Sequence, residues 1–291
     1  MMKYIGIIVN KKKDQNLKCF KHLAEILCDA GFTPVVSNEF RSVLHENKYI
    51  KTSLEEMFKM SSLVITLGGD GTLLNIADIA VRYDVAVLGV NLGMLGYLAQ
   101  LDKTEIDRIP EILNDKLHFQ KRMMLDVEVY RNGNSVYKYS ALNDAVVTRN
   151  AVLKPIYIDL YGQNKIITEY FCDGMIFSTP TGSSAYSLSV GGPVMDPTME
   201  AILVSAISPH SLSAHSLVFN PDKALECRAR TSKSVNALIS VDGRHVFYLQ
   251  PEDRVVVKKN SKYLKLVQLT DCDFYTVLKH KFSSRGKKDE N

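Results

Sequence analysis

An apolar run, Leu63 to Leu67, ends abruptly in Gly68-Gly69-Asp70-Gly71-Thr72. A run of this kind is typical of a buried strand that leads through a tight turn into a helix, here expected to begin at Thr72. Because glycine lacks a Cβ atom, such a turn lets backbone N–H groups approach an anion closely. The sequence therefore predicts a phosphate site at the end of this strand. A simple strand-to-helix turn that binds nothing is the alternative.

Asp70 is an unusual residue for a phosphate site, because a carboxylate repels bare phosphates. In phosphoryl transfer a carboxylate performs two tasks: it faces the acceptor hydroxyl or it shares a metal ion. We therefore expect Asp70 to do one of these.

Strands alternate with helical segments through the first 100 residues. Apolar runs predict strands over 4–10, 33–36, 63–67 and 85–90, and apolar spacing predicts helices over 15–29 and 73–81, the first ending at Gly31. This alternation predicts an α/β domain with a Rossmann-like parallel sheet. In such sheets ligands bind at the carboxyl ends of the strands, where Gly68–Thr72 and Asn91–Tyr97 fall.

From about Leu125 the apolar pattern becomes shorter and alternating, which predicts a β-rich second domain. Asn132-Gly133 and Asp242-Gly243 are typical of two-residue hairpin turns. Strands are expected over 125–130, 145–148, 156–161, 175–178, 237–241, 254–258 and 264–269. Helical spacing returns over Phe274–Phe282, and the charged residues 283–291 are expected to be disordered.

Composition excludes several classes of protein. The net charge of +4, from 36 basic and 32 acidic residues among 291, is too small and dispersed for a nucleic-acid platform. Five cysteines without a CxxC pair predict reduced thiols rather than a disulfide framework or a zinc ribbon. The first apolar run is too short for a signal peptide, and no run reaches the ~18 apolar residues of a membrane span. We expect a cytoplasmic protein without nucleic-acid or membrane partners.

The segment from Ser178 to Ser187 carries six small hydroxyl residues between an apolar strand and a helix-like segment. Hydroxyls both donate and accept hydrogen bonds, so this density suits a ligand rich in hydroxyls, such as a ribose. A Ser/Thr-rich cap and loop is the alternative. Asn143-Asp144 and Asp173-Gly174 are ambiguous in the same way, since each dipeptide is also common in turns.

The order of these motifs resembles that of NAD kinases. Gly68–Thr72, Asn91–Leu98, Asn143-Asp144 and Thr179–Tyr186 follow one another as in that family, and the resemblance runs from about residue 4 to about residue 282. The Gly-Gly-Asp-Gly turn alone is shared with lipid kinases and phosphofructokinases. The Thr-Pro-Thr-Gly-Ser block followed by Gly191-Gly192-Pro193 narrows the resemblance to NAD kinases. The chain has no Walker A motif, no GxGxxG fingerprint and no kinase HRD triplet.

The resemblance implies a Rossmann-like α/β domain over residues 1–100 and a β-sandwich-like domain over 101–272. Residues 273–291 would form a helix that returns to the first domain, followed by a disordered tail. The apolar residues that such a helix would bury are Phe274, Tyr275, Leu278 and Phe282.

The resemblance also implies an activity, the transfer of the γ-phosphoryl of ATP, or of polyphosphate in some members, to the adenosine 2′-hydroxyl of NAD, giving NADP. A divalent metal ion, Mg²⁺, is implied without identified ligands. Asp70 matches the aspartate that orients or deprotonates the hydroxyl. A homodimer or homotetramer is implied as well.

Further site residues are implied by position. Gly68, Gly69, Gly71 and Thr72 would hold the donor phosphates. Asn143 and Asp144 would hold adenine and ribose, and Asp173 would help to bind the dinucleotide. The pocket for adenosine and nicotinamide would be lined by Thr181, Ser184, Ala185, Tyr186 and Ser189. Asp144 replaces the usual Glu and Ser184 the usual Thr, which affects fine affinity more than activity.

Two other functions remain open. A lipid kinase of the diacylglycerol or sphingosine type shares the Gly-Gly-Asp-Gly turn, but its apolar acceptor suits the polar segment 179–189 poorly. A non-enzymatic NAD(P)-sensing module would leave Asp70 in the glycine turn without a role.

Overall fold

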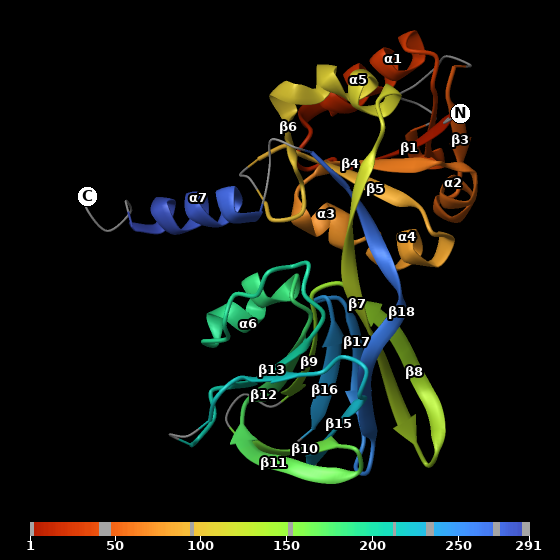
Figure 1. Cartoon of the computed structure of the whole chain (residues 1–291). Helices are drawn as coiled ribbons and strands as arrows, with labels where there is room; N and C mark the ends of the chain where they lie inside the picture. The colour runs from red at the N-terminus through yellow and green to blue at the C-terminus, as the bar shows by residue number, and fades with distance from the viewer. Residues whose placement is uncertain are drawn as a thin grey trace. The chain divides into compact units, whose positions relative to one another are not determined.

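The computed structural model of the protein describes residues 3–40, 48–93, 96–150, 154–211, 214–230, 236–269 and 274–286. The chain divides into two compact units (Figure 1). Unit 1 comprises residues 1–121 and 264–291, and unit 2 comprises residues 122–263. Within the described ranges, no helix has the length and apolar character needed to cross a membrane.

Unit 1 is built on a parallel sheet, as the alternation of strands and helices predicted. Its strands lie in the order β5 (Ala86–Asn91), β4 (Leu63–Gly68), β1 (Tyr4–Val9), β2 (Thr33–Ser37) and β3 (Ile50–Thr52). β6 (Leu101–Asp102) and the end of β18 (Arg254–Gln268) also pair in parallel with β5. Gly68 lies opposite Asn91 in the register, so the predicted ligand segments share one edge of the sheet.

Helices cover both faces of this sheet (Figure 1). On one face lie α1 (Lys18–Asp29) and α5 (Ile109–Asn114), and on the other lie α2 (Leu54–Met60), α3 (Asp70–Leu74) and α4 (Ala77–Tyr83). Short 3-10 turns occupy Gln15–Leu17, Asn38–Phe40 and Lys103–Arg108. Gly31 follows α1 with a φ of +84°, as expected for the residue after a helix. The single helix expected over 73–81 is two short helices, and the first begins at Asp70 rather than at Thr72.

The first unit extends beyond the boundary expected at residue 100. Residues 101–121 belong to it because Leu101, Ile106, Ile109 and Leu113 are part of its core, together with Phe20 of α1. The sequence pattern placed these residues in the second domain because they follow the last predicted strand of the sheet.

The C-terminal helix, α7 (Phe274–Gly286), belongs to unit 1, but only part of its expected face is buried. Val277 is buried, whereas Tyr275 is 65% and Phe282 55% exposed, so the prediction that these two aromatic side chains are buried is wrong. At 3.6 residues per turn these two side chains lie roughly 140° to 160° around the helix from Val277. The helix also continues past Ser283, and residues 287–291 lie outside the described part.

Unit 2 consists of two sheets. One has the order β11 (Lys165–Cys172), β10 (Ile156–Gly162), β15 (Leu225–Arg230), β18, β7 (His118–Arg131) and β8 (Asn134–Ala141). The other has the order β14 (Leu217–Phe219), β13 (Ile202–Ile207), β12 (Gly174–Ser178), β9 (Asp144–Arg149), β16 (Ala237–Val241) and β17 (His245–Leu249). β12 runs antiparallel to β9 and β13, as β10 does to β11 and β15. The two strands expected over 254–258 and 264–269 are one continuous strand, β18.

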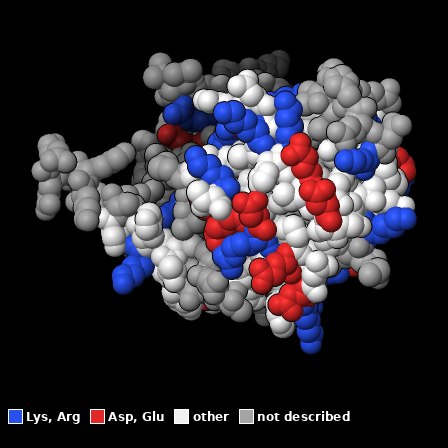
Figure 2. Space-filling model, turned by 90° about the horizontal axis from the view of Figure 1, so that it is seen from above, with Lys and Arg blue, Asp and Glu red and all other residues white. Residues whose placement is uncertain are grey.

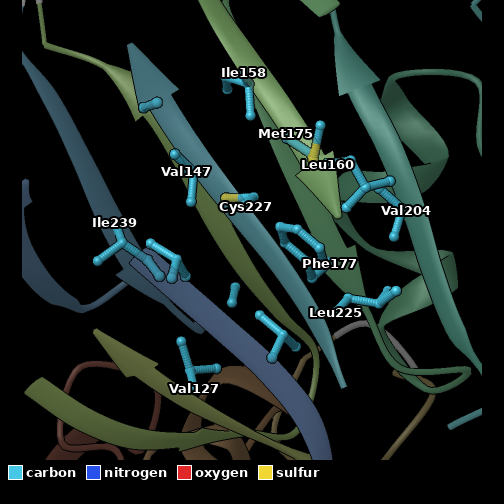
Figure 3. Packing of buried hydrophobic residues seen from close by; sticks show 14 of the residues in the cluster. Val127, Val147, Ile158, Leu160, Met175, Phe177, Val204, Leu225, Cys227 and Ile239 are labelled. Carbon is cyan, nitrogen blue, oxygen red and sulfur yellow. The ribbon is translucent and has the colours of Figure 1, made fainter. Parts of the chain in front are cut away.

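The inner faces of the two sheets form one core, which confirms the sandwich-like second domain (Figure 3). Val127, Leu160 and Cys227 come from one sheet, and Phe177 and Ile239 come from the other. Both predicted hairpins are present, and each residue of Asn132-Gly133 and of Asp242-Gly243 has a positive φ. Arg131 pairs with Asn134 across the expected two-residue turn, whereas Val241 pairs with His245, so the second loop has three residues rather than the two expected.

The charged side chains are mixed in sign on the face that Figure 2 shows, where Lys and Arg lie among Asp and Glu. The four cysteines in the described residues, Cys19, Cys28, Cys172 and Cys227, are free thiols. Cys272 lies outside the described part of the chain.

Candidate functional site

The predicted glycine turn lies at the carboxyl end of β4 and opens α3. Gly69 precedes the helix, and its carbonyl accepts a hydrogen bond from the backbone N–H of Thr72 at 2.8 Å. A Cβ atom on Gly68 would overlap the side chain of Thr72. The turn is therefore closed tightly on itself, and the predicted residues from Gly68 to Thr72 lie together around Asp70.

The carboxylate of Asp70 is fixed by backbone N–H groups from a second segment. The N–H groups of Tyr97, Leu98 and Ala99 donate to it at 2.8, 3.1 and 3.3 Å. A Cβ atom on Gly96 would overlap the same carboxylate. Asp70 is thus held by segment 96–99, which follows β5, and its place does not depend on a flexible side chain.

Three side chains surround the glycine turn, and of these the sequence did not single out Lys13. The Nζ atom of Lys13 lies 2.7 Å, and the Oδ1 atom of Asn91 3.7 Å, from the point where a Cβ of Gly69 would stand. Asn91 is only 1% exposed. Its Nδ2 atom and the Oγ1 atom of Thr72 are buried without a hydrogen-bond partner among the described residues. Unpaired buried donors are costly, so this edge of the sheet is suited to a ligand that accepts hydrogen bonds.

A second polar cluster lies in unit 2, where β9 begins and β12 ends. The backbone N–H of Thr179 donates to the carbonyl of Asn143 at 2.9 Å. A Cβ atom on Gly182 would overlap the backbone of Asn143. The hydroxyl of Thr181 is buried and unpaired within the described residues, and the hydroxyl of Ser184 donates to the carbonyl of Thr181 at 3.3 Å. The structure therefore brings Asn143-Asp144 and the hydroxyl-rich segment together, as a nucleoside pocket requires.

Asp242 anchors this cluster and was noted in the sequence only as a turn residue. Its carboxylate accepts hydrogen bonds from the backbone N–H groups of Leu142, Asn143 and Asp144 at 2.9, 2.8 and 3.1 Å. Burial and the nearby carboxylate of Asp242 raise the pKa of Asp144 to about 7. Burial also raises the pKa of Asp242, although its three backbone hydrogen bonds oppose that rise.

The remaining predicted residues lie at different depths. Ala185 is partly buried. The next residues form α6 (Tyr186–Ser189), in which Tyr186 is 44% exposed and Ser189 is also exposed. Asp173 lies apart from the cluster and pairs with Arg149, whose Nε is 2.6 Å from its Oδ1. Its neighbour Gly174 pairs with Thr148, whereas Asp144 pairs with Ser178. These two pairs are four residues apart along the strands, so the distance between them is about 13 Å at the rise of a strand.

The donor set around Asp70 limits the kind of metal site that this chain can form. The described residues contain no group of three or more His, Cys, Asp or Glu side chains that could hold a metal ion. Mg²⁺ does not need such a group, because it is often held by one or two carboxylates together with substrate phosphates. The single carboxylate of Asp70 beside the glycine turn fits an ion of that kind.

Comparison with known proteins identifies the family. Residues 5–120 match the ATP-NAD kinase N-terminal domain, and residues 142–269 match the ATP-NAD kinase C-terminal domain. The chain belongs to the NAD kinase family. It is therefore an enzyme, a phosphotransferase. The NAD kinase of Lachnoclostridium phytofermentans is 37% identical over 290 residues, with 98% of this chain and 100% of that protein covered. The NAD kinase of Caldanaerobacter subterraneus subsp. tengcongensis is 34% identical over 285 residues, with the same coverage.

Solved structures of NAD kinases show the same fold. The yeast NADH kinase complexed with NADH has a TM-score of 0.83 at 24% identity, covering 92% of this chain and 84% of that chain. An NAD kinase from Archaeoglobus fulgidus in complex with ATP has a TM-score of 0.71 at 19% identity, covering 91% of this chain and 93% of that chain.

Proposed function

We propose that the protein phosphorylates the adenosine 2′-hydroxyl of NAD with ATP and so produces NADP. The observation that carries this proposal is the Asp70 carboxylate, fixed by three backbone N–H groups beside a glycine turn. The names of its relatives support it. So do the ligands of the two similar structures, NADH and ATP.

Asp70 acts on the acceptor. A free hydroxyl is a poor nucleophile, and a carboxylate within hydrogen-bond reach orients it and accepts its proton as the oxygen attacks the γ-phosphorus. The bond from that phosphorus to the β–γ bridging oxygen breaks, and ADP leaves. Because the amides of 97–99 already fix Asp70, little reorganisation of the carboxylate is needed during the step.

The donor phosphates would be held by the turn residues Gly68, Gly69, Gly71 and Thr72. The absence of Cβ atoms from the glycines lets phosphate oxygens approach the backbone closely. Mg²⁺ would neutralise charge on the donor phosphates when bound. Polyphosphate has the same repeating anionic groups, so it belongs to the proposal as a second donor.

The acceptor would be held by the cluster in unit 2. Asn143 and Asp144 would bind adenine and ribose, since an amide and a carboxyl group together supply both donors and acceptors. The unpaired hydroxyl of Thr181 offers a further partner. Tyr186 offers an exposed ring, which suits stacking on a planar base. The other proposed contacts with the dinucleotide are made by Asp173, Ser184, Ala185 and Ser189.

The proposal includes a homodimer or homotetramer, which size-exclusion chromatography with light scattering tests on the purified protein. A single molar mass equal to that of one chain at micromolar concentration would contradict it.

The activity is tested by incubating the protein with NAD, Mg²⁺ and either ATP or polyphosphate and measuring NADP with an NADP-specific dehydrogenase. NADP formed with at least one donor is the expected result. Binding to diacylglycerol vesicles with lipid phosphorylation and without NADP formation would favour the lipid kinase. Tight NAD binding without phosphorylation by either donor would favour a sensing module.

A further inference from the structure

Lys13 is a cation placed at the glycine turn by backbone structure. It follows β1, and the turn that carries it is tied to β4 because the backbone N–H of Asn10 donates to the carbonyl of Leu67 at 2.8 Å. The N–H of Lys13 closes that turn on the carbonyl of Asn10 at 2.9 Å. The next residue, Asp14, is buried, and its carboxylate caps α1 through the N–H groups of Cys19 and Phe20.

The ammonium group of Lys13 lies against Gly69. Its Nζ atom is 2.7 Å, and its Cε atom 4.0 Å, from the point where a Cβ atom of Gly69 would stand. No carboxylate among the described residues forms an ion pair with Lys13, whereas Lys11 of the same turn pairs with Glu39 at 2.6 Å. Because the Lys13 ammonium group faces a glycine backbone and pairs with no carboxylate of the described residues, it is positioned to attract an anion from solution.

Two buried polar groups beside the glycine turn are also unpaired within the described residues. The Nδ2 atom of Asn91 and the Oγ1 atom of Thr72 have no hydrogen-bond partner among the described residues. The side chain of Asn91 borders Gly69 from β5, and that of Thr72 borders Gly68 from α3. An amide N–H and a hydroxyl can both donate to a phosphate oxygen, and Lys binds phosphate as a point charge.

We infer that Lys13, with Asn91 and Thr72, binds the phosphate chain of the phosphoryl donor and thereby positions it at the glycine turn. This inference rests on the proposed function and adds a residue of the β1–α1 turn to it. Lys13 accepts no proton and forms no covalent bond. Its ammonium group reduces the repulsion between the donor phosphates and Asp70, which share this edge of the sheet.

The test compares Lys13→Ala with Lys12→Ala in the full-length protein. Lys12 is exposed, lies in the same turn and carries the same charge, but it is not among the atoms that border Gly69. Lys13→Ala is expected to raise the KM for ATP by about tenfold or more, as for the loss of a hydrogen bond to a charged group, while the KM for NAD changes less than about twofold. Lys12→Ala is expected to match the wild type, and Lys13→Arg to recover most of the ATP affinity. Equal KM values for ATP in the two alanine variants, or an increase confined to NAD, would overturn the inference.

A binding measurement separates this inference from the proposed function. Calorimetric titration of the protein with inorganic tripolyphosphate, in the absence of NAD, requires no turnover. Weaker binding of tripolyphosphate by Lys13→Ala than by Lys12→Ala supports the inference. If the wild type also forms no NADP, only the proposed function fails. Equal binding by both variants overturns the inference, whether or not NADP is formed.

Discussion

Asp144 and Asp242 are joined by two hydrogen bonds, each donated by a backbone N–H group. The N–H of Asp144 donates to the Oδ1 atom of Asp242 at 3.1 Å, and the N–H of Asp242 donates to the carbonyl of Asp144 at 2.9 Å. The hairpin turn between β16 and β17 is thereby fixed to the start of β9. The pair places the buried carboxyl group of Asp144 near the half-buried carboxyl group of Asp242 at the proposed adenosine pocket.

This pair predicts a pH dependence of stability. Burial, and then the neighbouring Asp242, raise the pKa of Asp144 from 3.8 to about 7 in the folded protein. The folded state therefore holds a proton that the unfolded state releases, and the associated stability is lost as the pH rises from about 4 through about 7. Asp144→Asn cannot lose this proton. We expect the unfolding free energy of the wild type to fall relative to that of Asp144→Asn between pH 5 and pH 8.

Urea unfolding at pH 5, 6, 7 and 8 measures this difference, which is at most on the order of 1 kcal/mol per pH unit. Asp222→Asn is the control, because Asp222 is an exposed acid of the same unit. Parallel stability curves for the wild type and Asp144→Asn would contradict the account.

The close approach of Gly96 to Asp70 predicts that a single methyl group blocks the reaction. In Gly96→Ala the new Cβ would overlap the Asp70 carboxylate, so the side chain must move. A displacement of about 1 Å in a catalytic group can lower the rate on the order of 100-fold. Gly93→Ala is the matched control, since nothing lies within 4 Å of its Cβ position. Measured turnover should fall in Gly96→Ala only, and a fall of equal size in both variants would remove the steric argument.

Helix α7 is expected to support segment 96–99. The ring of Phe274 lies 6.2 Å from that of Tyr97, and the Nζ atom of Lys281 lies 4.9 Å from the centre of the Tyr97 ring. The backbone of Tyr97 in turn donates to Asp70. Deletion of residues 274–291 should therefore lower both the melting temperature, by roughly 4 °C for the loss of one to two buried apolar side chains, and the turnover.

Differential scanning calorimetry and the NADP assay measure the effects of this deletion. A shorter deletion, of residues 287–291, is the control because it leaves α7 intact. If the deletion of 274–291 changed neither the melting temperature nor the turnover, α7 would have no role in holding Tyr97.

Local sequence patterns were sufficient to predict most of the fold. Alternating strands and helices gave the parallel sheet of unit 1, and Asn132-Gly133 and Asp242-Gly243 gave two hairpins, because these features depend on neighbours in the chain. The helix after the glycine turn was placed two residues too late, since no side-chain cap marks its start at Gly69. The exposure of Tyr275 and Phe282 was missed because apolar spacing alone does not say which face of a helix is covered.

The contacts that define the candidate site could not be predicted in this way. Asp242 reaches Asp144 across 98 residues, and Lys13 meets Gly69 only because β1 and β4 are adjacent in the sheet. Pairings of this kind depend on strand order, which local periodicity does not determine. The three lysines after the first strand were a visible signal, but nothing in the sequence distinguished Lys13 from Lys11 and Lys12.

The central claim is that Asp70 orients the 2′-hydroxyl of NAD and accepts its proton during phosphorylation. Its most direct test is the rate of NADP formation from NAD, ATP and Mg²⁺ by the wild type and by Asp70→Asn, with circular dichroism to show that both are folded. The account predicts NADP formation by the wild type and a loss of about 100-fold or more in the variant. Near-equal rates in a folded Asp70→Asn protein would exclude Asp70 from the chemistry, and the absence of NADP from the wild type with ATP and with polyphosphate would contradict the proposed function itself.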